Sequence, residues 1–526
     1  MKKREEYISE FLRNPELLLR KKPFTRGADN DSDETHDGET IGINGTIIAR
    51  LPKYKRRIVS QERFMRELDP NCHDCLFDEN IPSICVKIAD NDFRDIKYTR
   101  TAIPFQKIIR NKQVLHLTGN PMVFTLSEQN PTDEQMECFI KFKDAWEERN
   151  QDGMKKLFAE KQLSLGDAGM LYYFDQDGCI KSRVIGFDDG YVILPHNDEN
   201  GDRVCEAVYY MSGEDEYIDM YDKTNHYRFT NRVDDIVVVK EGSEDITEKK
   251  STWKLVDGFP QKHGFDEIPL ITKRGDVAWN DVQTLIDNYE VLYNVFNAIQ
   301  KRFGWGLLYV KGRFNENARK IAGSVVLNDT SIEGKGDAKF LTPPSPENTI
   351  MTLEKIEDNI KIGSSTTFIL PKDVKTSGDI SGIAIQLTQS LDIEKGEQLA
   401  KSYQNVANKM VRLFKQGLAI ELVNKEEDEH AITKFDGLKI HAKFKVWRPF
   451  SATEYNQMLV TLKAAGLISE KTGIEKNTES TPDEVARVSK QKEEQEQKDA
   501  EKMVNEAKIK QQYGSSNTEK INKNEQ

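Results

Sequence analysis

The chain has 526 residues, of which 37% are hydrophobic and 31% charged, and its formal net charge is −12. This length exceeds what one hydrophobic core serves, so we expect two to four domains or subdomains, with thin layers, disordered parts, or both. The acidic balance argues against a protein whose main task is gripping the phosphate backbone, because such proteins are usually basic.

Cysteine usage and apolar runs indicate a soluble intracellular protein. The six cysteines are sparse and lack the spacing of a disulfide framework, which fits a reducing compartment. The first residues contain no apolar run of signal length. No window approaches roughly 18 uninterrupted apolar residues, so no membrane span is expected.

The first 26 residues have the pattern of a short basic amphipathic helix that Pro15 divides. An acidic, turn-rich linker follows at 27–40 and imitates the start of a calcium loop. Glu34 stands where that loop needs glycine, and Thr40 where it needs the bidentate glutamate. A solvated loop is therefore favoured over a calcium site.

Two clusters follow before residue 90. A basic group surrounds Tyr54, and a solvated helix end or a subunit contact is favoured there over a nucleic-acid patch. The run Cys72-His73-Asp74-Cys75, with Cys85 ten residues on, supplies at most part of a zinc site, so a structural role is favoured over zinc binding. The basic residues are Lys53, Lys55, Arg56 and Arg57.

The stretch 92–126 predicts an apolar helix, a Thr-Gly-Asn-Pro turn at 118–121, and a strand. A helical block at 132–165 has a capping box from Thr132 to Gln135 and a break near 150–153. The region after it predicts an antiparallel meander that begins with a hairpin turning at 175–178. Tyrosines occupy its strand positions, and packing is favoured over a base- or sugar-stacking platform. They are Tyr172, Tyr173, Tyr209, Tyr210 and Tyr227.

Two amphipathic helices, at 281–303 and 346–363, flank a small module with a strand, a helix at 316–323 and further strands. Such a hairpin cannot bury its apolar stripe alone. Neighbours in a ring would cover it, since a heterologous interface can close into a cycle.

A loop follows, and from about 387 a long helix with few breakers. A flexible loop that feeds a long helix suggests a lever that moves relative to a rigid support. The two Ser-Gly pairs of the loop are where the backbone is expected to flex, because glycine tolerates wide φ/ψ changes. Residues 438–450 alternate as a strand, helices follow, and the polar segment after about 490 is expected to be disordered or helical.

In this order of parts the sequence resembles the portal proteins of tailed bacteriophages, particularly those of long-tailed phages. The resemblance covers about 90–480. It is carried by the Thr-Gly-Asn-Pro turn, the helix–insert–helix hairpin and the Ser-Gly loop before the long helix. Two short phrases, Arg448-Pro449-Phe450 and Ala465-Gly466-Leu467-Ile468-Ser469, complete it.

The resemblance implies an α+β portal fold with a wing of helices and antiparallel strands, a helical stem, a small α/β clip, a tunnel loop with a long helix, and a helical crown. The implied parts are the N-terminal arm and outer wing (1–90), wing (91–280), stem helix (281–304), clip (305–345), second stem helix (346–363), tunnel loop (364–386), long helix and returning wing strand (387–450), crown (451–490) and polar tail (491–526).

Two groups of site residues follow from this assignment. The tunnel loop would face DNA, and its two lysines would touch the phosphate backbone without reading sequence, unless they are simply solvated. The stem helices would pack between subunits. The loop residues are Lys372, Lys375, Ser377, Gly378, Ser381 and Gly382. The stem residues are Leu285, Tyr289, Leu292, Phe296, Ile356 and Ile360.

The expected function is that of a non-enzymatic channel, a ring of typically about twelve subunits at one capsid vertex. It would initiate capsid assembly and pass double-stranded DNA during packaging and ejection. Its partners would be the major capsid protein and scaffold, the terminase large subunit and a head–tail adaptor. It would be assembled in the host cytoplasm and need no cofactor or metal.

Two alternatives remain. One is a virion adaptor or scaffold without a channel, which would form a monomer or small oligomer. The other is a metal-dependent DNA-processing enzyme, for which the acidic pairs Asp188-Asp189 and Asp234-Asp235 are the candidates. Both pairs stand in turn-like contexts without a lysine at a useful spacing.

Overall fold

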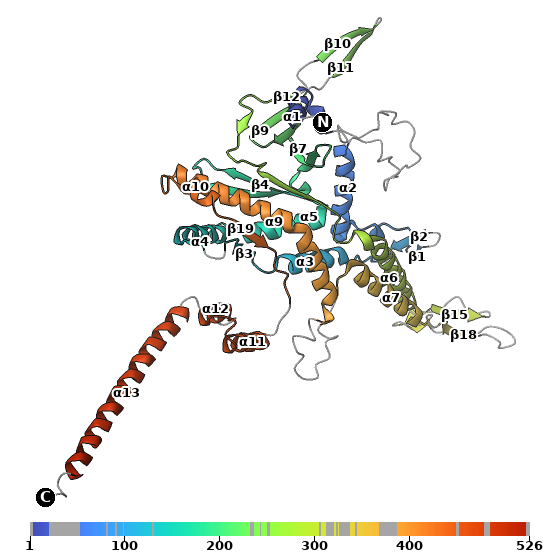
Figure 1. Cartoon of the computed structure of the whole chain (residues 1–526). Helices are drawn as coiled ribbons and strands as arrows, with labels where there is room; N and C mark the ends of the chain where they lie inside the picture. The colour runs from blue at the N-terminus through green and yellow to red at the C-terminus, as the bar shows by residue number, and fades with distance from the viewer. Residues whose placement is uncertain are drawn as a thin grey trace. The chain divides into compact units, whose positions relative to one another are not determined.

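The fold combines helices with small antiparallel sheets, so the predicted α+β class is confirmed. The described part divides into two units: unit 1 is Met1–Leu370 with Gln389–Trp447, and unit 2 is Pro371–Thr388 with Arg448–Gln526. The computed structural model (Figure 1) describes residues 4–19, 53–79, 81, 83–89, 92–97, 99–128, 131–231, 236–241, 244–249, 253–304, 307–311, 320–321, 324–325, 337–341, 345–367, 387–448, 452–477 and 484–521.

The N-terminal helix α1 (Arg4–Arg13) and the 3-10 turn η1 (Pro15–Leu18) cover one face of a six-stranded sheet. Tyr7 and Phe11 lie four residues apart on one side of α1, and both are buried against the sheet. The break at Pro15 is confirmed. The sheet contains β6 (Val192–Asn197), β7 (Arg203–Ser212), β8 (Asp215–Tyr221), β9 (Asn225–Asn231), β12 (Lys254–Leu255) and β13 (Gln261–Lys262).

A second, three-stranded sheet has the order β14-β4-β5, and the hairpin between β4 and β5 turns at 175–178 as predicted. The tyrosines divide between packing and exposure. Tyr172, Tyr209 and Tyr227 are buried, which confirms the packing interpretation for them, whereas Tyr173 is exposed. Tyr210 is half-buried and stacks on Tyr217. The strands are β4 (Asp167–Phe174), β5 (Ile180–Ile185) and β14 (Leu270–Arg274), with the 3-10 turn η5 (Phe187–Asp189) after β5.

Helices α4 (Asp133–Glu148) and α5 (Gln151–Leu165) form the predicted helical block. The capping box is present: the Thr132 hydroxyl accepts from the Gln135 N–H, and the Gln135 side chain accepts from the Thr132 N–H. The break falls at Asn150, whose left-handed backbone and side-chain bond to the Gly153 N–H start α5.

The long helix α9 (Ser390–Asn424) is packed into the main core of unit 1. Tyr403, Met410 and Phe414 are fully buried among side chains of α4, α5 and β4. At Gly417 a Cβ would stand 1.9 Å from Ile180 Cδ1, so the helix touches β5 where only glycine fits. The expectation of a lever is therefore corrected, because most of α9 belongs to the rigid support.

Three further segments of unit 1 differ from prediction. The returning strand is short: β19 (Ile440–Lys443) pairs with β3 (Val123–Leu126) and ends well before 450. The hairpin of β1 (Ser83–Ala89) with β2 (Asp92–Lys97) was not predicted. The strand β10 (Ile236–Glu241) was predicted as part of the meander, but it pairs with β11 (Glu244–Lys249) in a separate hairpin. The remaining elements are α2 (Lys53–Leu68), η3 (Pro70–Cys72), η4 (Asp74–Leu76), α3 (Phe105–Thr118) and α10 (Ala431–Asp436).

The predicted helix–insert–helix order is present as η6 (Asn280–Val282) and α6 (Gln283–Gly304), an insert, and α7 (Glu347–Ser364). The helix expected at 316–323 is wrong in part, because Lys320–Ile321 forms the strand β16 and pairs with β17 (Ser324–Val325). Residues 316–319 lie outside the described part. The outer strands β15 (Leu307–Lys311) and β18 (Asp337–Leu341) pair with each other.

Unit 2 is helical where it is described after residue 448. Helices α11 (Ala452–Ala464) and α12 (Glu470–Lys476) contact each other, and α13 (Glu484–Ile521) follows. The tail at 491–526 was expected to be disordered or helical, and α13 corrects the expectation of disorder as far as Ile521. Its Glu, Lys, Gln and Ala residues are strong helix formers.

Candidate functional site

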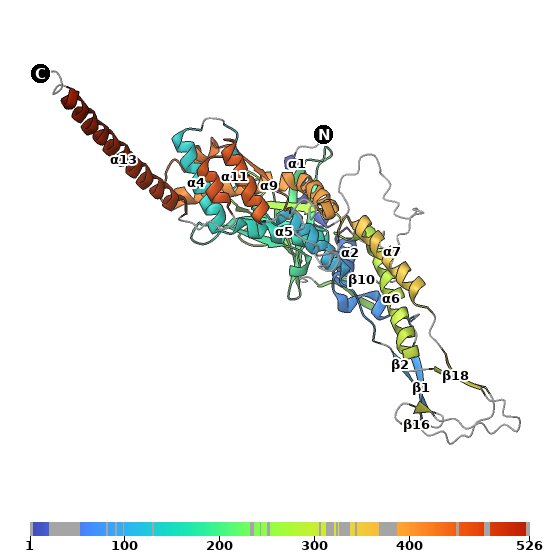
Figure 2. The same ribbon diagram turned by 90° about the horizontal axis from the view of Figure 1, so that it is seen from below.

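The α6–α7 hairpin is the candidate site that the structure describes best. Figures 1 and 2 show the two helices side by side, and they contact each other. Five positions at steps of four residues, the first in η6 and the others in α6, are buried, and we call them the inner ridge. The inner ridge consists of Val282, Ile286, Glu290, Asn294 and Ala298.

The predicted stem residues divide between this interior and the surface. Ile360 of α7 is 0% exposed and Ile356 is nearly so, and both pack against the inner ridge and Ile109 of α3. Their own chain covers them, so they leave little surface for a neighbouring subunit. The other four form a half-buried stripe that we call the outer flank, and three of them, Leu285, Tyr289 and Leu292, also pack against this buried cluster of their own chain. The outer flank consists of Leu285, Tyr289, Leu292 and Phe296.

The outer surface of α7 carries apolar side chains that the sequence analysis did not select. Ile362 is 66% exposed, and Ile350 and Met351 are also exposed. Apolar groups of this size on a helix of a hairpin indicate a surface that another chain can cover.

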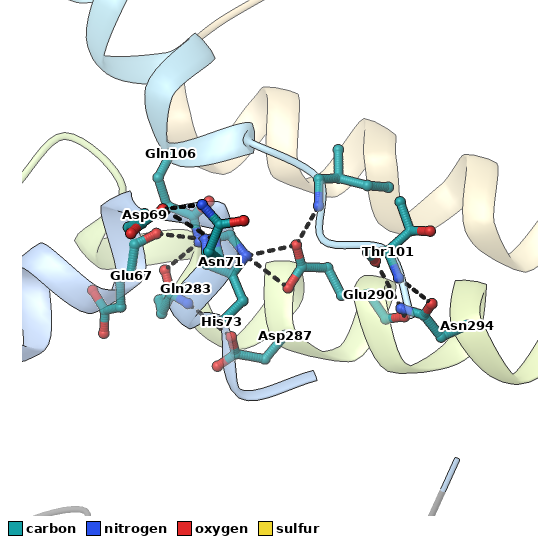
Figure 3. Close-up of polar contacts among 11 residues, drawn as sticks. Glu67, Asp69, Asn71, His73, Thr101, Gln106, Gln283, Asp287, Glu290 and Asn294 are labelled. Atoms are coloured by element: carbon teal, nitrogen blue, oxygen red, sulfur yellow. Dashed lines mark hydrogen bonds and ion pairs between the residues drawn. The ribbon is translucent and has the colours of Figure 1, made fainter. Parts of the chain in front are cut away.

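A buried polar anchor holds α6 against the segment before β1 (Figure 3). The His73 ring Nδ1 lies 2.8 Å from Glu290 Oε1, and its Nε2 lies 2.8 Å from the Glu67 carbonyl oxygen. The side chains of His73 and Glu290 are 3% and 1% exposed. Since both ring nitrogens face acceptors, both must donate, and the ring is the charged imidazolium.

The electrostatics agree with this protonation state. Burial lowers the pKa of His73, but its hydrogen bond to Glu290 and the charge of that carboxylate outweigh burial, so the net pKa lies above its usual value. Glu67, which supplies the carbonyl, also accepts from the Trp279 indole N–H at 2.8 Å through its side chain. The anchor therefore joins α2, the 70–76 turns and α6.

The same polar positions of the inner ridge hold the extended segment before α3. Glu290 Oε1 accepts from the Ile103 N–H at 2.6 Å. The Asn294 side chain accepts from the Thr101 N–H at 2.7 Å and donates to the Thr101 carbonyl at 2.8 Å (Figure 3). The Asn294 amide thus pairs with the Thr101 backbone as a neighbouring strand would. These bonds attach α6 to the extended segment before α3.

The anchor explains the Cys-His-Asp-Cys segment without zinc. Both His73 nitrogens are engaged, Cys72 is exposed and Cys75 is buried. Burial, together with the nearby Glu290 carboxylate, raises the pKa of the Cys75 thiol. Within the described residues, which do not include the Cys85 side chain, no group of three or more His, Cys, Asp or Glu could hold a metal ion.

A cavity of about 330 Å³ borders the anchor. Its wall is mixed in charge, with Arg63 and Arg66 from α2 opposite Asp74 and Asp287. Burial raises the pKa of Asp287. The opposing charges give the cavity no clear preference for an anion or a cation.

The predicted tunnel-loop residues, from Lys372 to Gly382, lie outside the described residues. The two ends of that segment are described. The Thr367 N–H donates to Asp392 Oδ1 at 3.1 Å, and the Thr367 hydroxyl donates to Asp392 Oδ2. The loop base is thus closed by a side-chain contact between the end of the hairpin and the start of α9.

The acidic pair considered for an enzyme does have a lysine beside it. Lys161 Nζ lies 2.5 Å from Asp188 Oδ2 and 3.1 Å from Asp189 Oδ2. Sequence spacing did not reveal this contact, because α5 brings the lysine from another element. The ammonium occupies the place that a metal ion would need. Asp234 and Asp235 lie outside the described residues.

The basic cluster at the start of α2 also has an internal partner. Arg57 Nε donates to Asp167 Oδ2 at 2.7 Å, and Arg274 donates to both oxygens of the same buried carboxylate. Arg57 therefore has a structural role in unit 1, and it is not a free nucleic-acid contact. The side chains of the other three basic residues lie outside the described part.

Among the described helices, none is both long enough and apolar enough to cross a membrane.

Comparisons with known proteins can now be set beside this geometry. Residues 79–499 match the family described as "Phage portal protein, SPP1 Gp6-like". A matching solved structure is titled "Neck of empty GTA particle computed with C6 symmetry"; it is 13% identical, the alignment covers 70% of this chain and 87% of that chain, and the TM-score is 0.33. No curated protein gives a significant match. The family match contains α6, α7 and α9 in full.

Proposed function

Since the chain belongs to the SPP1 Gp6-like family of phage portal proteins, we propose that copies of it form a ring-shaped channel at one capsid vertex, through which DNA is packaged and ejected. The observation that carries this proposal is the family match over residues 79–499, which spans the hairpin, the loop and the long helix together.

The hairpin supports a ring through its two apolar surfaces. The outer flank is half-buried in the isolated chain, and Ile350, Met351 and Ile362 of α7 are exposed. Water-exposed apolar surface of this kind is stabilised when another chain covers it. In a ring, one subunit's outer flank would pack against the α7 surface of the next, a heterologous contact that closes on itself.

The charge of the chain suits a conduit. Because the net charge of the chain is −12, it would attract the phosphate backbone only weakly, and DNA would slide along the channel without binding tightly. We place Lys372 and Lys375 at the constriction as backbone contacts without sequence preference. The clip between α6 and α7 would dock the head–tail adaptor, and the crown would lie in unit 2.

Portal proteins are structural proteins, and the motor activity would belong to a partner. The sequence contains no phosphate loop with the usual Gly, Lys and Ser/Thr spacing, so ATP hydrolysis is assigned to the terminase large subunit. The major capsid protein and scaffold would bind the ring during assembly in the host cytoplasm.

The test is the oligomeric state of the purified full chain. Light scattering and negative-stain images down the axis should show a closed ring of about twelve subunits, as a cyclic heterologous interface requires. A monomer or small oligomer at all concentrations would instead favour the adaptor alternative. Incubation with plasmid DNA and Mg²⁺ should give no turnover, and clean nicking or cleavage would favour the enzyme alternative.

A further inference from the structure

The chain crosses between the two units at three points. The residues of unit 1 close to these three passages lie near one another. The passages lie between Leu370 and Pro371, between Thr388 and Gln389, and between Trp447 and Arg448. Near each passage a residue of unit 1 is held by a specific contact: Thr367, Asp392 and Trp447.

The first two of these residues contact each other directly. Asp392 lies in the first turn of α9, its side chain is only 3% exposed, and both of its oxygens accept from Thr367. Among the described residues no lysine, arginine or histidine forms an ion pair with it.

The third passage is attached to the same place through α3. The His116 carbonyl accepts from the Trp447 N–H at 2.8 Å, and the His116 ring Nδ1 donates back to the Trp447 carbonyl at 3.0 Å. The two rings meet edge to face with centroids 5.3 Å apart. His116 is 0% exposed and Trp447 is half-buried.

Helices α3 and α9 are in close contact at His116 and Gly396. A Cβ at Gly396 would stand 3.0 Å from both His116 Cβ and Val446 Cγ1. One turn earlier on α3, the Gln113 amide donates to the Ser364 carbonyl at 3.1 Å, just before Thr367. The residues Gln113 and His116 thus hold the end of the hairpin and the chain at 446–447.

We propose that Asp392 and His116 are positioning residues of a single joint, which fixes both ends of the segment 368–391 and the chain that enters unit 2 at 448. Asp392 and His116 are buried at the centre of this joint, and Thr367 and Trp447 contact them from half-buried positions. If the segment is the DNA-facing loop, which rests on the proposed function, a load on the loop is transmitted through Asp392, Gly396 and His116 to Trp447. Loop and crown would then respond together.

The joint predicts coupled local opening, which limited trypsin digestion of the purified full chain measures. Lys372 and Lys375 report on the loop, and the exposed Lys445, two residues before Trp447, reports on the third passage, because the Arg448–Pro449 bond resists trypsin. Asp392→Ala should raise the cleavage rate at all three sites by about tenfold, since cleavage follows the population of the opened form. His116→Phe, which keeps a ring but removes the bond to the Trp447 carbonyl, should do the same. Cleavage elsewhere should not change.

Two further variants keep the result decisive. Thr367→Val keeps the shape and removes only the hydroxyl donor, so it should give the same pattern at smaller amplitude if Asp392→Ala fails to fold. Asp358→Ala, at an exposed position of α7, is the matched control and should leave all rates unchanged. If Asp392→Ala or Thr367→Val exposes only the loop lysines, and His116→Phe only Lys445, the passages are independent and the joint is overturned; unchanged cleavage rates in all three variants overturn it as well. This readout does not need a ring, so it can succeed or fail separately from the proposed channel.

Discussion

His73 and Glu290 are 217 positions apart in the sequence, yet the His73 ring nitrogen lies 2.8 Å from the Glu290 carboxylate in a site closed to solvent. The pair fastens a helix of the hairpin to the 70–76 turns, which also contact this helix through η4. The chemistry is that of a buried ion pair, which is costly to break when only one partner is removed.

Removing the carboxylate should therefore destabilise unit 1. Glu290→Ala leaves the His73 cation and the Ile103 N–H without their partner, and the free energy of unfolding should fall by about 3–5 kcal/mol. Urea denaturation followed by tryptophan fluorescence measures the loss. The matched control is Glu354→Ala on the exposed side of α7, which should change stability by less than about 0.5 kcal/mol. Equal effects of the two substitutions would show that the anchor contributes nothing.

The anchor should also make stability depend on pH. The folded pKa of His73 is raised above the unfolded value of about 6.5, so its contribution is complete below that value. It is lost as the pH rises through the folded pKa. Thermal melts from about pH 6.5 upward should show wild-type stability falling with pH, whereas His73→Gln should show a flatter profile. A His73→Gln variant with the wild-type slope would contradict the prediction.

Burial of Glu67 should add a second pH dependence of opposite origin. Burial raises the pKa of Glu67 above its unfolded value of about 4.3, so the folded state loses stability as the pH rises from that value through the folded pKa. Glu67→Gln should remove this loss, and thermal melts that start at about pH 4 measure it; a variant with the wild-type profile would contradict the prediction.

The outward-facing part of the outer flank should be needed for assembly and not for folding. Among the four outer-flank residues, Phe296 is the one that does not pack against the buried cluster of the hairpin, so Phe296→Asp should abolish rings while the circular dichroism spectrum stays that of the wild type. Ile432→Asp, at an exposed apolar position of α10, serves as the control and should leave rings intact. Wild-type rings from Phe296→Asp, seen by light scattering, would exclude this position from the subunit interface.

Ile360 of α7, which packs against the inner ridge, should be needed for folding and not for assembly. Ile360→Ala leaves a cavity against Ile109 and should lower the free energy of unfolding by about 2–5 kcal/mol. Rings should still form below the lowered melting temperature. If Ile360→Ala instead abolishes rings without changing the denaturation midpoint, this side chain lies at a subunit interface after all.

The loop lysines should matter for DNA and not for assembly. Lys372→Ala combined with Lys375→Ala should leave rings intact and impair packaging or retention of DNA, because the constriction loses its positive charge. Replacing both with arginine keeps the charge and is the control. Packaged DNA protected from nuclease is the measurement. Failure of ring formation would mean that this segment belongs to a subunit interface and not to the channel.

Elements that depend on residues close together in the sequence were predicted correctly. The capping box at Thr132 and the turn at 175–178 each depend on residues within a few positions, and both are present. The hairpin was likewise predicted by its apolar spacing. The orientation of α6 was not, because the apolar stripe that includes Leu285 and Leu292 is only half-buried, whereas the inner ridge passes through Glu290 and Asn294.

A signal for the anchor was present but incomplete. Glu290 and Asn294 continue the four-residue step of Val282 and Ile286, which marks them as polar residues on a buried face. Their partners could not be read from the sequence, because His73 and Thr101 come from distant segments. The same limit applies to Asp392 and to Lys161, whose contacts depend on how the helices pack.

The two glycine contacts of α9 have a consequence for any motion of this helix. Gly396 fits against His116, and Gly417 fits against Ile180, where a Cβ would stand 1.9 Å away. Because every other residue of the helix is larger, sliding by one turn would drive a side chain into each of these partners. The two glycines thus favour one register of α9 along its neighbours α3 and β5. Sliding of α9 by one turn would therefore require Ile180 and His116 to move, so we expect the helix to shift as one piece together with the strands and helices around it.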